Sequence, residues 1–195
     1  MRFEHEIGSP PPEKPAQTDE QALSAAGPAV PAFTVLAREV SGSEEAFVAL
    51  MNRKAAELGM TATHFCNPTG LNDPDHVSTV RDIARLEQAA LQNETFRQLF
   101  TTARYTVPAT DLHPQGFTVE STLFSQLTGT ELHNGEILGG KTGYTSQAGL
   151  CLAGLARVKG QEYILVTAGA QGNHSTEPYH IDDAVKVYRR VSRAF

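Results

Sequence analysis

The sequence predicts an α/β fold in which an antiparallel sheet is covered by a cluster of helices and a C-terminal helix. Three observations lead to this fold class. Capped segments with helical apolar spacing lie between residues 43 and 91, two β-rich runs flank a turn near residue 160, and helical spacing returns near the C-terminus. The chain has 195 residues, of which 40% are hydrophobic, and this is enough for one domain with a buried core.

The first part of the chain differs in composition from the rest. Residues 9–34 are rich in proline, as in Ser9-Pro10-Pro11-Pro12, and show neither helical nor strand periodicity. We therefore expect residues 1–34 to be a disordered or extended N-terminus and the folded domain to cover residues 35–195. The first six residues include two acids and no apolar run, so they do not form a secretory signal peptide.

Capping signals predict the helices. Ser41-Gly42-Ser43-Glu44 has the pattern of a capping box and opens a predicted helix over about 43–58, which Gly59 would end. Thr79-Val80-Arg81-Asp82 has a similar pattern and predicts a second helix, and residues 93–100 predict a short third one.

A loop is predicted between the first two helices. Residues 64–76 are dominated by asparagine, aspartate, glycine and proline, so the loop must be pinned by Phe65 and Leu71. His64 is expected to support this loop, and the nearby aspartates are expected to cap backbone amides rather than to bind a metal.

The second half of the chain predicts the sheet. Gly149–Val158 and Glu162–Ala168 are rich in β-forming residues and flank Lys159-Gly160-Gln161, which is typical of a hairpin with a three-residue turn. A final helix is predicted after a loop over residues 173–178, because apolar residues recur there at helical spacing. It would cover one face of the sheet.

Composition excludes several classes of partner. The net charge is −6 and no basic cluster is present, so nucleic acid is not an expected partner. No apolar run reaches the roughly 20 residues of a membrane-spanning helix. The two cysteines and the scattered histidines lack the spacing of a metal site, so we expect no metal and no cofactor.

The most informative motif is Lys141-Thr142-Gly143, which follows a glycine pair and precedes strand-like sequence. A Lys-Thr-Gly strand is the third of three motifs in a penicillin-sensitive serine active site. In such a site, lysine supplies a cation for a substrate carboxylate, threonine adds a hydroxyl, and glycine leaves room for the substrate backbone. We expect these three residues to bind substrate, and Tyr144 and Thr145 to form the rim of the groove.

Five ordered stretches resemble one family. They are Ser43–Asn52, Leu58–Met60, Thr63–Leu71, Ser78–Asp82 and Gly140–Thr145. Together they resemble the C-terminal part of the catalytic domain of serine-type D-alanyl-D-alanine carboxypeptidases, the low-molecular-weight penicillin-binding proteins of peptidase family S11. The resemblance implies an incomplete serine-transpeptidase or β-lactamase-like domain over residues 35–195.

The resemblance also implies a reaction and a cellular context. Family members trim the terminal D-alanine of a peptidoglycan pentapeptide through a serine acyl-enzyme, need no cofactor, bind β-lactams and act in the cell envelope, where they take part in cell-wall synthesis and cell shape. The expected partner is therefore a peptidoglycan peptide that ends in D-Ala-D-Ala. Because no signal peptide is present, this chain itself would stay in the cytoplasm.

The other two family motifs are absent. No serine is followed three positions later by lysine, and no Ser-x-Asn triplet occurs. We therefore expect no catalytic residue in this chain and no acyl-enzyme. Two interpretations remain open, namely the carboxypeptidase activity of an intact parent and a non-catalytic truncated remnant or domain that binds peptidoglycan or a partner. A β-lactamase would share the triplet but not the segment Asn67–Leu71.

Overall fold

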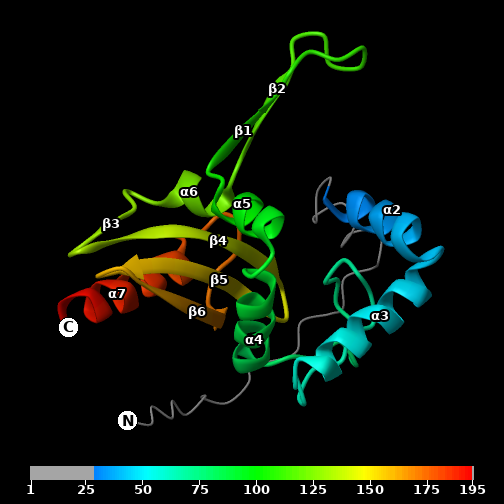
Figure 1. Cartoon of the computed structure of the whole chain (residues 1–195), viewed down its shortest axis with the longest axis horizontal. Helices are drawn as coiled ribbons and strands as arrows, with labels where there is room; N and C mark the ends of the chain where they lie inside the picture. The colour runs from blue at the N-terminus through cyan, green and yellow to red at the C-terminus, as the bar shows by residue number, and fades with distance from the viewer. Residues whose placement is uncertain (1–28, 195) are drawn as a thin grey trace.

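A four-stranded antiparallel sheet with helices on both faces forms the larger part of this computed structural model, which describes residues 29–194 (Figure 1). The elements are α2 (Ala29–Ser41), α3 (Glu44–Glu57), α4 (Val80–Ala90), α5 (Glu94–Thr101), β1 (Arg104–Val107), β2 (Phe117–Glu120), α6 (Thr122–Gln126), β3 (Glu131–Leu132), β4 (Gly135–Thr145), β5 (Gly149–Val158), β6 (Gln161–Ala170) and α7 (Tyr179–Ala194). The predicted antiparallel sheet, helical cluster and C-terminal helix are confirmed. No helix in the described range is long and apolar enough to cross a membrane.

The main core lies between the sheet and α7. The strands follow the order β3-β4-β5-β6, and α7 packs on β5 and β6 while α4 and α5 lie against the opposite face (Figure 1). The buried cluster under α7 consists of Leu123, Ile137, Leu152, Ala156, Ile181, Ala184 and Tyr188. Burial of these apolar side chains is the main driving force for this packing.

An irregularity in β4 sets which side chains face that core. Ile137 pairs with Ala156, but the register shifts between Ile137 and Gly139, so Lys141 pairs with Ala153 and Thr142 pairs with Leu152. Such a β-bulge changes the alternation of side chains along a strand. Thr142 therefore lies on the α7 face, and Lys141 lies on the opposite one.

The predicted helices form, with two corrections. Ser43, not Ser41, caps α3 by accepting a hydrogen bond from the Ala46 N–H at 3.1 Å, because Ser41 is still part of α2. Helix α2 begins at Ala29, six residues before the predicted start of the folded domain. Proline is compatible with the first turn of a helix, where N–H groups have no acceptor within the helix, so the proline-rich composition concealed this start. Residues 1–28 lie outside the described residues.

The other capping predictions are confirmed. The Thr79 side chain accepts from the Asp82 N–H at the start of α4, and the Asn93 side chain accepts from the Phe96 N–H at the start of α5. The β5–β6 turn has two residues rather than three. Val158 pairs with Gln161, and both Lys159 and Gly160 adopt positive φ angles, as a tight hairpin turn requires.

Two parts of the chain extend from the sheet region. Strands β1 and β2 form a separate hairpin that projects away from the body (Figure 1). On another side, α2 and α3 lie next to the segment that we call the Asn67 loop, residues 64–77, whose ends are joined by a β-bridge between His64 and Val77. Helix α4 connects this helical part to the sheet.

Candidate functional site

Strand β4 presents the Lys-Thr-Gly triplet at an edge. β5 pairs with β4 along its length, whereas β3 pairs only with Gly135 and Glu136. Within the described residues, the outer edge of β4 at residues 141–145 therefore has no strand partner. Backbone N–H and C=O groups at such an edge can pair with an extended peptide.

The three glycines around the triplet serve different purposes. A Cβ on Gly139 would lie 2.4 Å from the Phe100 carbonyl oxygen of α5, and one on Gly140 would lie 2.7 Å from Leu123 Cδ2 of α6. These two glycines let α5 and α6 pack closely on the strand. A Cβ on Gly143 would meet no atom of the described residues within 4 Å, so this glycine leaves open space beside the strand.

Lys141 contributes a cation to this edge. Its Nζ donates a hydrogen bond to the carbonyl oxygen of Thr142. The residue as a whole keeps exposed surface, but partial burial of the amine lowers the pKa of Lys141. An anion that entered here would attract the amine and so stabilise its charged form, which partial desolvation disfavours.

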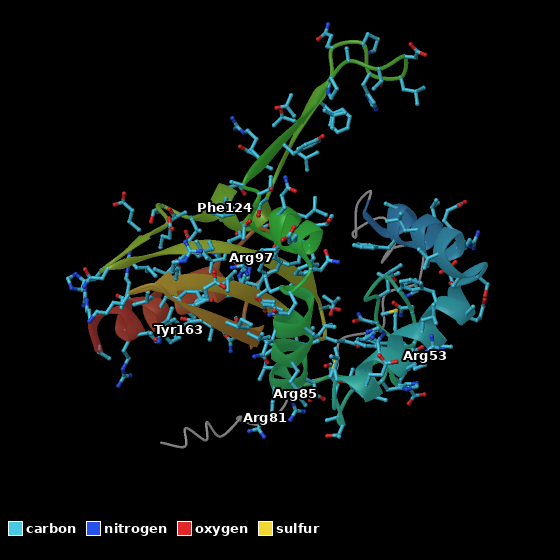
Figure 2. All side chains as sticks on the ribbon, viewed as in Figure 1. Arg53, Arg81, Arg85, Arg97, Phe124 and Tyr163 are labelled. Atoms are coloured by element: carbon cyan, nitrogen blue, oxygen red, sulfur yellow. The ribbon has the colours of Figure 1, made fainter. Side chains whose placement is uncertain are left out.

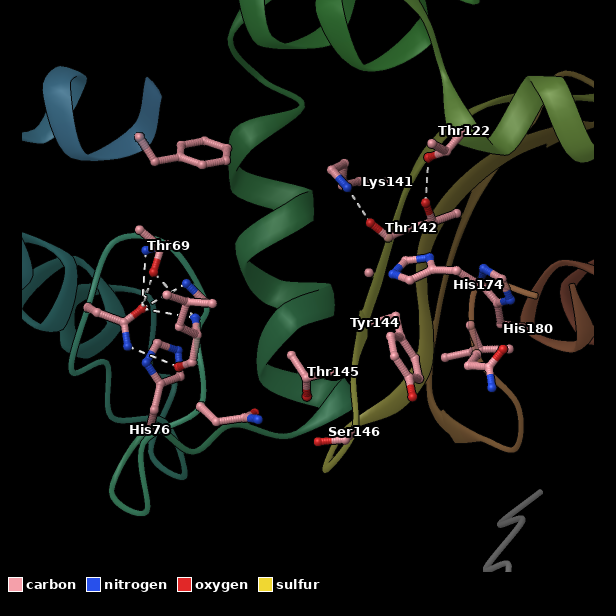
Figure 3. A pocket seen from close by; sticks show the side chains of 18 of the residues that line it. Thr69, His76, Thr122, Lys141, Thr142, Tyr144, Thr145, Ser146, His174 and His180 are labelled. Atoms are coloured by element: carbon pink, nitrogen blue, oxygen red, sulfur yellow. Dashed lines mark hydrogen bonds between the residues drawn. The ribbon is translucent and has the colours of Figure 1, made fainter. Parts of the chain in front are cut away.

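Thr142 is held from the other side of the strand. Its hydroxyl shares a hydrogen bond with the hydroxyl of Thr122, the first residue of α6 (Figure 3). Because one hydroxyl must donate and the other accept, each keeps further capacity for a ligand.

The opposite wall is the Asn67 loop. The Asn67 Oδ1 accepts from the Gly70 N–H at 2.8 Å, from the Thr69 hydroxyl at 2.9 Å and from the Leu71 N–H at 3.2 Å. The loop is tied to α3 by Asn52, whose side chain accepts from the Phe65 N–H and donates to the Phe65 carbonyl, both at 2.8 Å. Side-chain amides thus replace the backbone pairing that the loop lacks.

A cavity of about 690 Å³ lies between this loop and β4 (Figure 3). The five predicted site residues all line it, together with residues of the loop, Phe33 of α2 and the segment before α7. The structure therefore brings Lys141, Thr142, Gly143, Tyr144 and Thr145 together with the loop that the sequence predicted. The volume of the cavity is in the range of pockets that bind small ligands.

Tyr144, Thr145 and His174 line the cavity next to one another. The rings of Tyr144 and His174 meet edge to face with centroids 4.9 Å apart. The Thr145 hydroxyl accepts from the Ala148 N–H at 3.0 Å and so closes the turn between β4 and β5. Ser146 is the only serine that lines the cavity within the described residues, and it follows β4 in that turn.

Sequence reasoning missed several lining residues. Thr122, His174 and His180 come from segments far from the triplet, and no local pattern marks them. His180 is 4% exposed, and its Nδ1 has no hydrogen-bond partner among the described residues. Burial lowers the pKa of His180, although the nearby carboxylate of Asp182 acts to raise it. His76 also lines the cavity, and its Nδ1 accepts from the Cys66 N–H at 3.2 Å.

Neither metal nor disulfide chemistry is indicated in the described part of the chain. No group of three or more histidine, cysteine, aspartate or glutamate side chains could hold a metal ion there. Cys66 and Cys151 are free and only partly buried.

The fold is shared with solved structures of a D-alanyl-D-alanine carboxypeptidase and of a DD-transpeptidase. A crystal structure of a D-alanyl-D-alanine carboxypeptidase from Mycobacterium tuberculosis superposes with a TM-score of 0.65 at 26% sequence identity, covering 83% of this chain and 58% of that one. The Streptomyces K15 DD-transpeptidase gives a TM-score of 0.61 at 27% identity, covering 75% of this chain and 55% of that one.

The family follows from the sequence comparisons. The family model described as D-alanyl-D-alanine carboxypeptidase, Peptidase_S11, matches residues 28–172, so the chain belongs to this family. The carboxypeptidase DacF of Bacillus subtilis is 35% identical over 141 residues, which cover 71% of this chain and 34% of DacF. A D-alanyl-D-alanine endopeptidase of Pseudomonas aeruginosa is 34% identical over 154 residues, which cover 79% of this chain and 46% of that protein. The chain therefore spans less than half the length of these two relatives.

Proposed function

We propose that this chain forms the substrate-binding part of a D-alanyl-D-alanine carboxypeptidase and that its cavity holds a peptidoglycan peptide ending in D-Ala-D-Ala. The free edge of β4 beside the cavity carries this proposal. An extended peptide laid along that edge would gain backbone hydrogen bonds from the strand and would be enclosed by the Asn67 loop. The whole protein would act on the cell wall, outside the cytoplasm.

Each triplet residue has a separate role in this binding. The Lys141 amine attracts the terminal carboxylate, and the Thr142 hydroxyl adds a hydrogen bond whose direction is set by Thr122. Gly143 leaves the space that the peptide backbone needs. Tyr144 and Thr145 limit the groove at its outer end.

The covalent step needs groups that these residues do not supply. In the proposed reaction, a serine hydroxyl gives its proton to a lysine and attacks the carbonyl between the two D-alanines. D-alanine then leaves with a proton, and water hydrolyses the acyl-enzyme. The sequence contains neither Ser-x-x-Lys nor Ser-x-Asn, so residues 1–195 alone are expected to bind the peptide without cleaving it.

A second candidate is a domain that binds peptidoglycan without turnover in any context. The cavity hydroxyls favour it, because apart from Ser146 they belong to threonines and to Tyr144 within the described residues. None of these hydroxyls has a lysine placed as in Ser-x-x-Lys.

Two measurements on the same purified chain test the proposal. Intact mass after incubation with a fluorescent penicillin is expected to show no covalent adduct. NMR titration with an acetylated tripeptide ending in D-Ala-D-Ala is expected to shift resonances of β4, whereas the same peptide ending in L-Ala-L-Ala should shift them less. A stoichiometric penicillin adduct would contradict the claim that the chain lacks a nucleophile.

A matched pair of variants locates the binding. Lys141→Ala is expected to weaken binding of the D-Ala-D-Ala peptide by about ten- to a hundredfold, since a charge-assisted hydrogen bond contributes roughly 1.5–3 kcal/mol. Lys186→Ala, which removes an exposed lysine from α7, should leave the affinity unchanged. Equal affinities of the two variants, or no binding by the unmodified chain, would overturn the proposed function.

A further inference from the structure

Helix α4 is fixed to the helical part of the molecule at its N-terminal end. The Asp82 carboxylate, which is 2% exposed, accepts from the Ala62 N–H at 3.0 Å and from the Thr63 hydroxyl at 2.9 Å. Arg85 donates to Asp82 at 2.9 Å and to the Gly59 carbonyl at 2.6 Å, near the start of the helix (Figure 2). This end of α4 therefore moves with α3 and the loop that follows it.

The rest of α4 rests on the sheet. It packs against β6 and β5, and it lies between the Asn67 loop and β4 (Figures 1 and 3). Because the cavity is bounded by that loop and by β4, the seating of α4 on the sheet sets how far apart the two cavity walls lie.

A carboxyl group is buried in this contact. Glu87 is 4% exposed, and neither of its carboxyl oxygens has a hydrogen-bond partner among the described residues. At 3.6 residues per turn it lies roughly 140° around the helix from Asp82, on the same side as the buried Leu91 four residues later. Helix α4 thus has two buried carboxyl groups. That of Asp82, near the loop, is hydrogen-bonded, and that of Glu87, at the contact with the sheet, is not.

Within residues 29–194, no cation pairs with Glu87. The elements around it bring Asp82 and Arg85 on α4, Arg157 on β5, Glu162 on β6, Arg97 on α5 and Tyr188 on α7. Asp82 and Arg85 pair with each other, and Glu162 pairs with both Arg97 and Arg157. Burial raises the pKa of the Tyr188 hydroxyl, and the negative charge of Glu87 raises it further. That hydroxyl is also buried without a partner in the described range.

An ionised carboxylate in such a place would be costly, whereas a protonated one is far cheaper to bury. Burial alone raises the pKa of Glu87 to about 8. Glutamate is charged above its usual pKa of 4.5, so the unfolded chain would release this proton over a pH range in which the folded chain keeps it.

We propose that Glu87 holds α4 on the sheet only while its carboxyl group carries a proton, so that α4 is a proton-dependent joint between the two walls of the cavity. Loss of the proton places an uncompensated charge in the contact and loosens α4 from β6. This dependence on pH is opposite in sign to that of Asp82, because the hydrogen bonds of Asp82 favour its charged form and lower its pKa.

Thermal unfolding, followed by far-UV circular dichroism from pH 5 to pH 9, tests the proton dependence. The unfolding temperature of the unmodified chain should fall as the pH rises, and that of Glu87→Gln should fall less. The two should be similar at pH 5 and differ by at least about 5 °C at pH 9. Glu39→Gln, which changes an exposed glutamate on α2, should behave as the unmodified chain does. Parallel pH curves for the unmodified chain and Glu87→Gln would overturn the proposal.

A second measurement uses only the unmodified chain. The side-chain carboxyl ¹³C resonance of Glu87, assigned by through-bond correlation from the α4 backbone, should titrate with a midpoint above pH 6. Hydrogen exchange, corrected for the pH dependence of the intrinsic rate, should show α4 losing protection between pH 6 and pH 9 more than α7 does. A midpoint near 4.5, or equal changes in both helices, would refute the joint even if Glu87→Gln did not fold.

Discussion

Thr122 and Thr142 are joined by a hydroxyl–hydroxyl hydrogen bond across 20 residues of sequence. The bond connects the start of α6 to the middle of β4. It fixes the rotamer of the threonine that we propose to contact the substrate carboxylate. Binding-site orientation of this kind contributes to affinity because less side-chain freedom is lost when the ligand arrives.

Thr122→Val is therefore expected to weaken binding of the D-Ala-D-Ala peptide by a few-fold and to change stability by about 1 kcal/mol or less, since the bond is exposed. The measurement is an NMR titration together with urea unfolding. Thr118→Val, which removes one partner of the exposed Thr106–Thr118 hydroxyl pair in the projecting hairpin, is the control. Equal affinities for the two variants would show that Thr122 does not orient Thr142.

The glycines of β4 give a second prediction. Gly140→Ala would place a methyl group 2.7 Å from Leu123 Cδ2 and 2.8 Å from the Ala153 carbonyl oxygen, so the chain should lose roughly 1–3 kcal/mol of unfolding free energy. Gly143→Ala meets no atom and should leave urea unfolding unchanged while it reduces peptide binding. A destabilised Gly143→Ala, or a stable Gly140→Ala, would contradict the packing described for this strand.

Asn52 should prove more important for stability than its polar character suggests. Its side chain makes two hydrogen bonds to the backbone of Phe65, and Asn52→Ala would leave both backbone groups without that partner. The expected loss is about 1–3 kcal/mol of unfolding free energy, measured by urea denaturation. Asn72→Ala, at an exposed position of the same loop, should cost much less. A similar cost for both variants would mean that Asn52 does not anchor the loop.

The hydrogen bonds of Asp82 predict how the stability of the chain changes in acid. Burial tends to raise the pKa of Asp82, but hydrogen bonds from Ala62, Thr63 and Arg85 outweigh it and hold the pKa below its usual value of 3.8. A lowered folded-state pKa gives stability that is present above 3.8 and is lost as the pH falls through the folded-state value. Asp82→Asn should be less stable than the unmodified chain at pH 7 and should lose less stability between pH 4 and pH 2.

Thermal unfolding from pH 2 to pH 7 checks this prediction. Asp75→Asn, in an exposed turn, is the control and should keep the acid dependence of the unmodified chain. If the unfolding temperature of Asp82→Asn fell as steeply in acid as that of the unmodified chain, Asp82 would not contribute to the loss of stability at low pH.

Local signals in the sequence predicted most of the fold. The caps at Thr79 and Asn93 are confirmed because they act within one turn of the helix that they start. The hairpin at Lys159-Gly160 was predicted for the same reason, although its turn is one residue shorter than expected. Helix α2 was missed because composition over a long window concealed a helix that tolerates proline in its first turn.

The site was predicted in part. The triplet and the Asn67 loop were found as motifs, but the contacts of Thr122 and His174 depend on tertiary packing and leave no mark in the local sequence. Glu87 shows the same limit in another form. Its helical spacing is that of an inward-facing position, whereas charged residues are ordinarily exposed, and only the packing of α4 decides between the two.

The bulge between Ile137 and Gly139 has a consequence for changes in chain length. Ile137 and Lys141 are four residues apart, and in a regular strand they would point to the same face. Deleting Leu138 would straighten the strand and leave Lys141 opposite Ala153. Deleting Gly140 could also leave Lys141 opposite Ala153, but only by moving Leu138 into the position of Gly139, where a Cβ would lie 2.4 Å from the Phe100 carbonyl oxygen. Single-residue deletions before and after Gly139 are thus unequal, because only the first keeps a residue without a side chain at the close contact with α5.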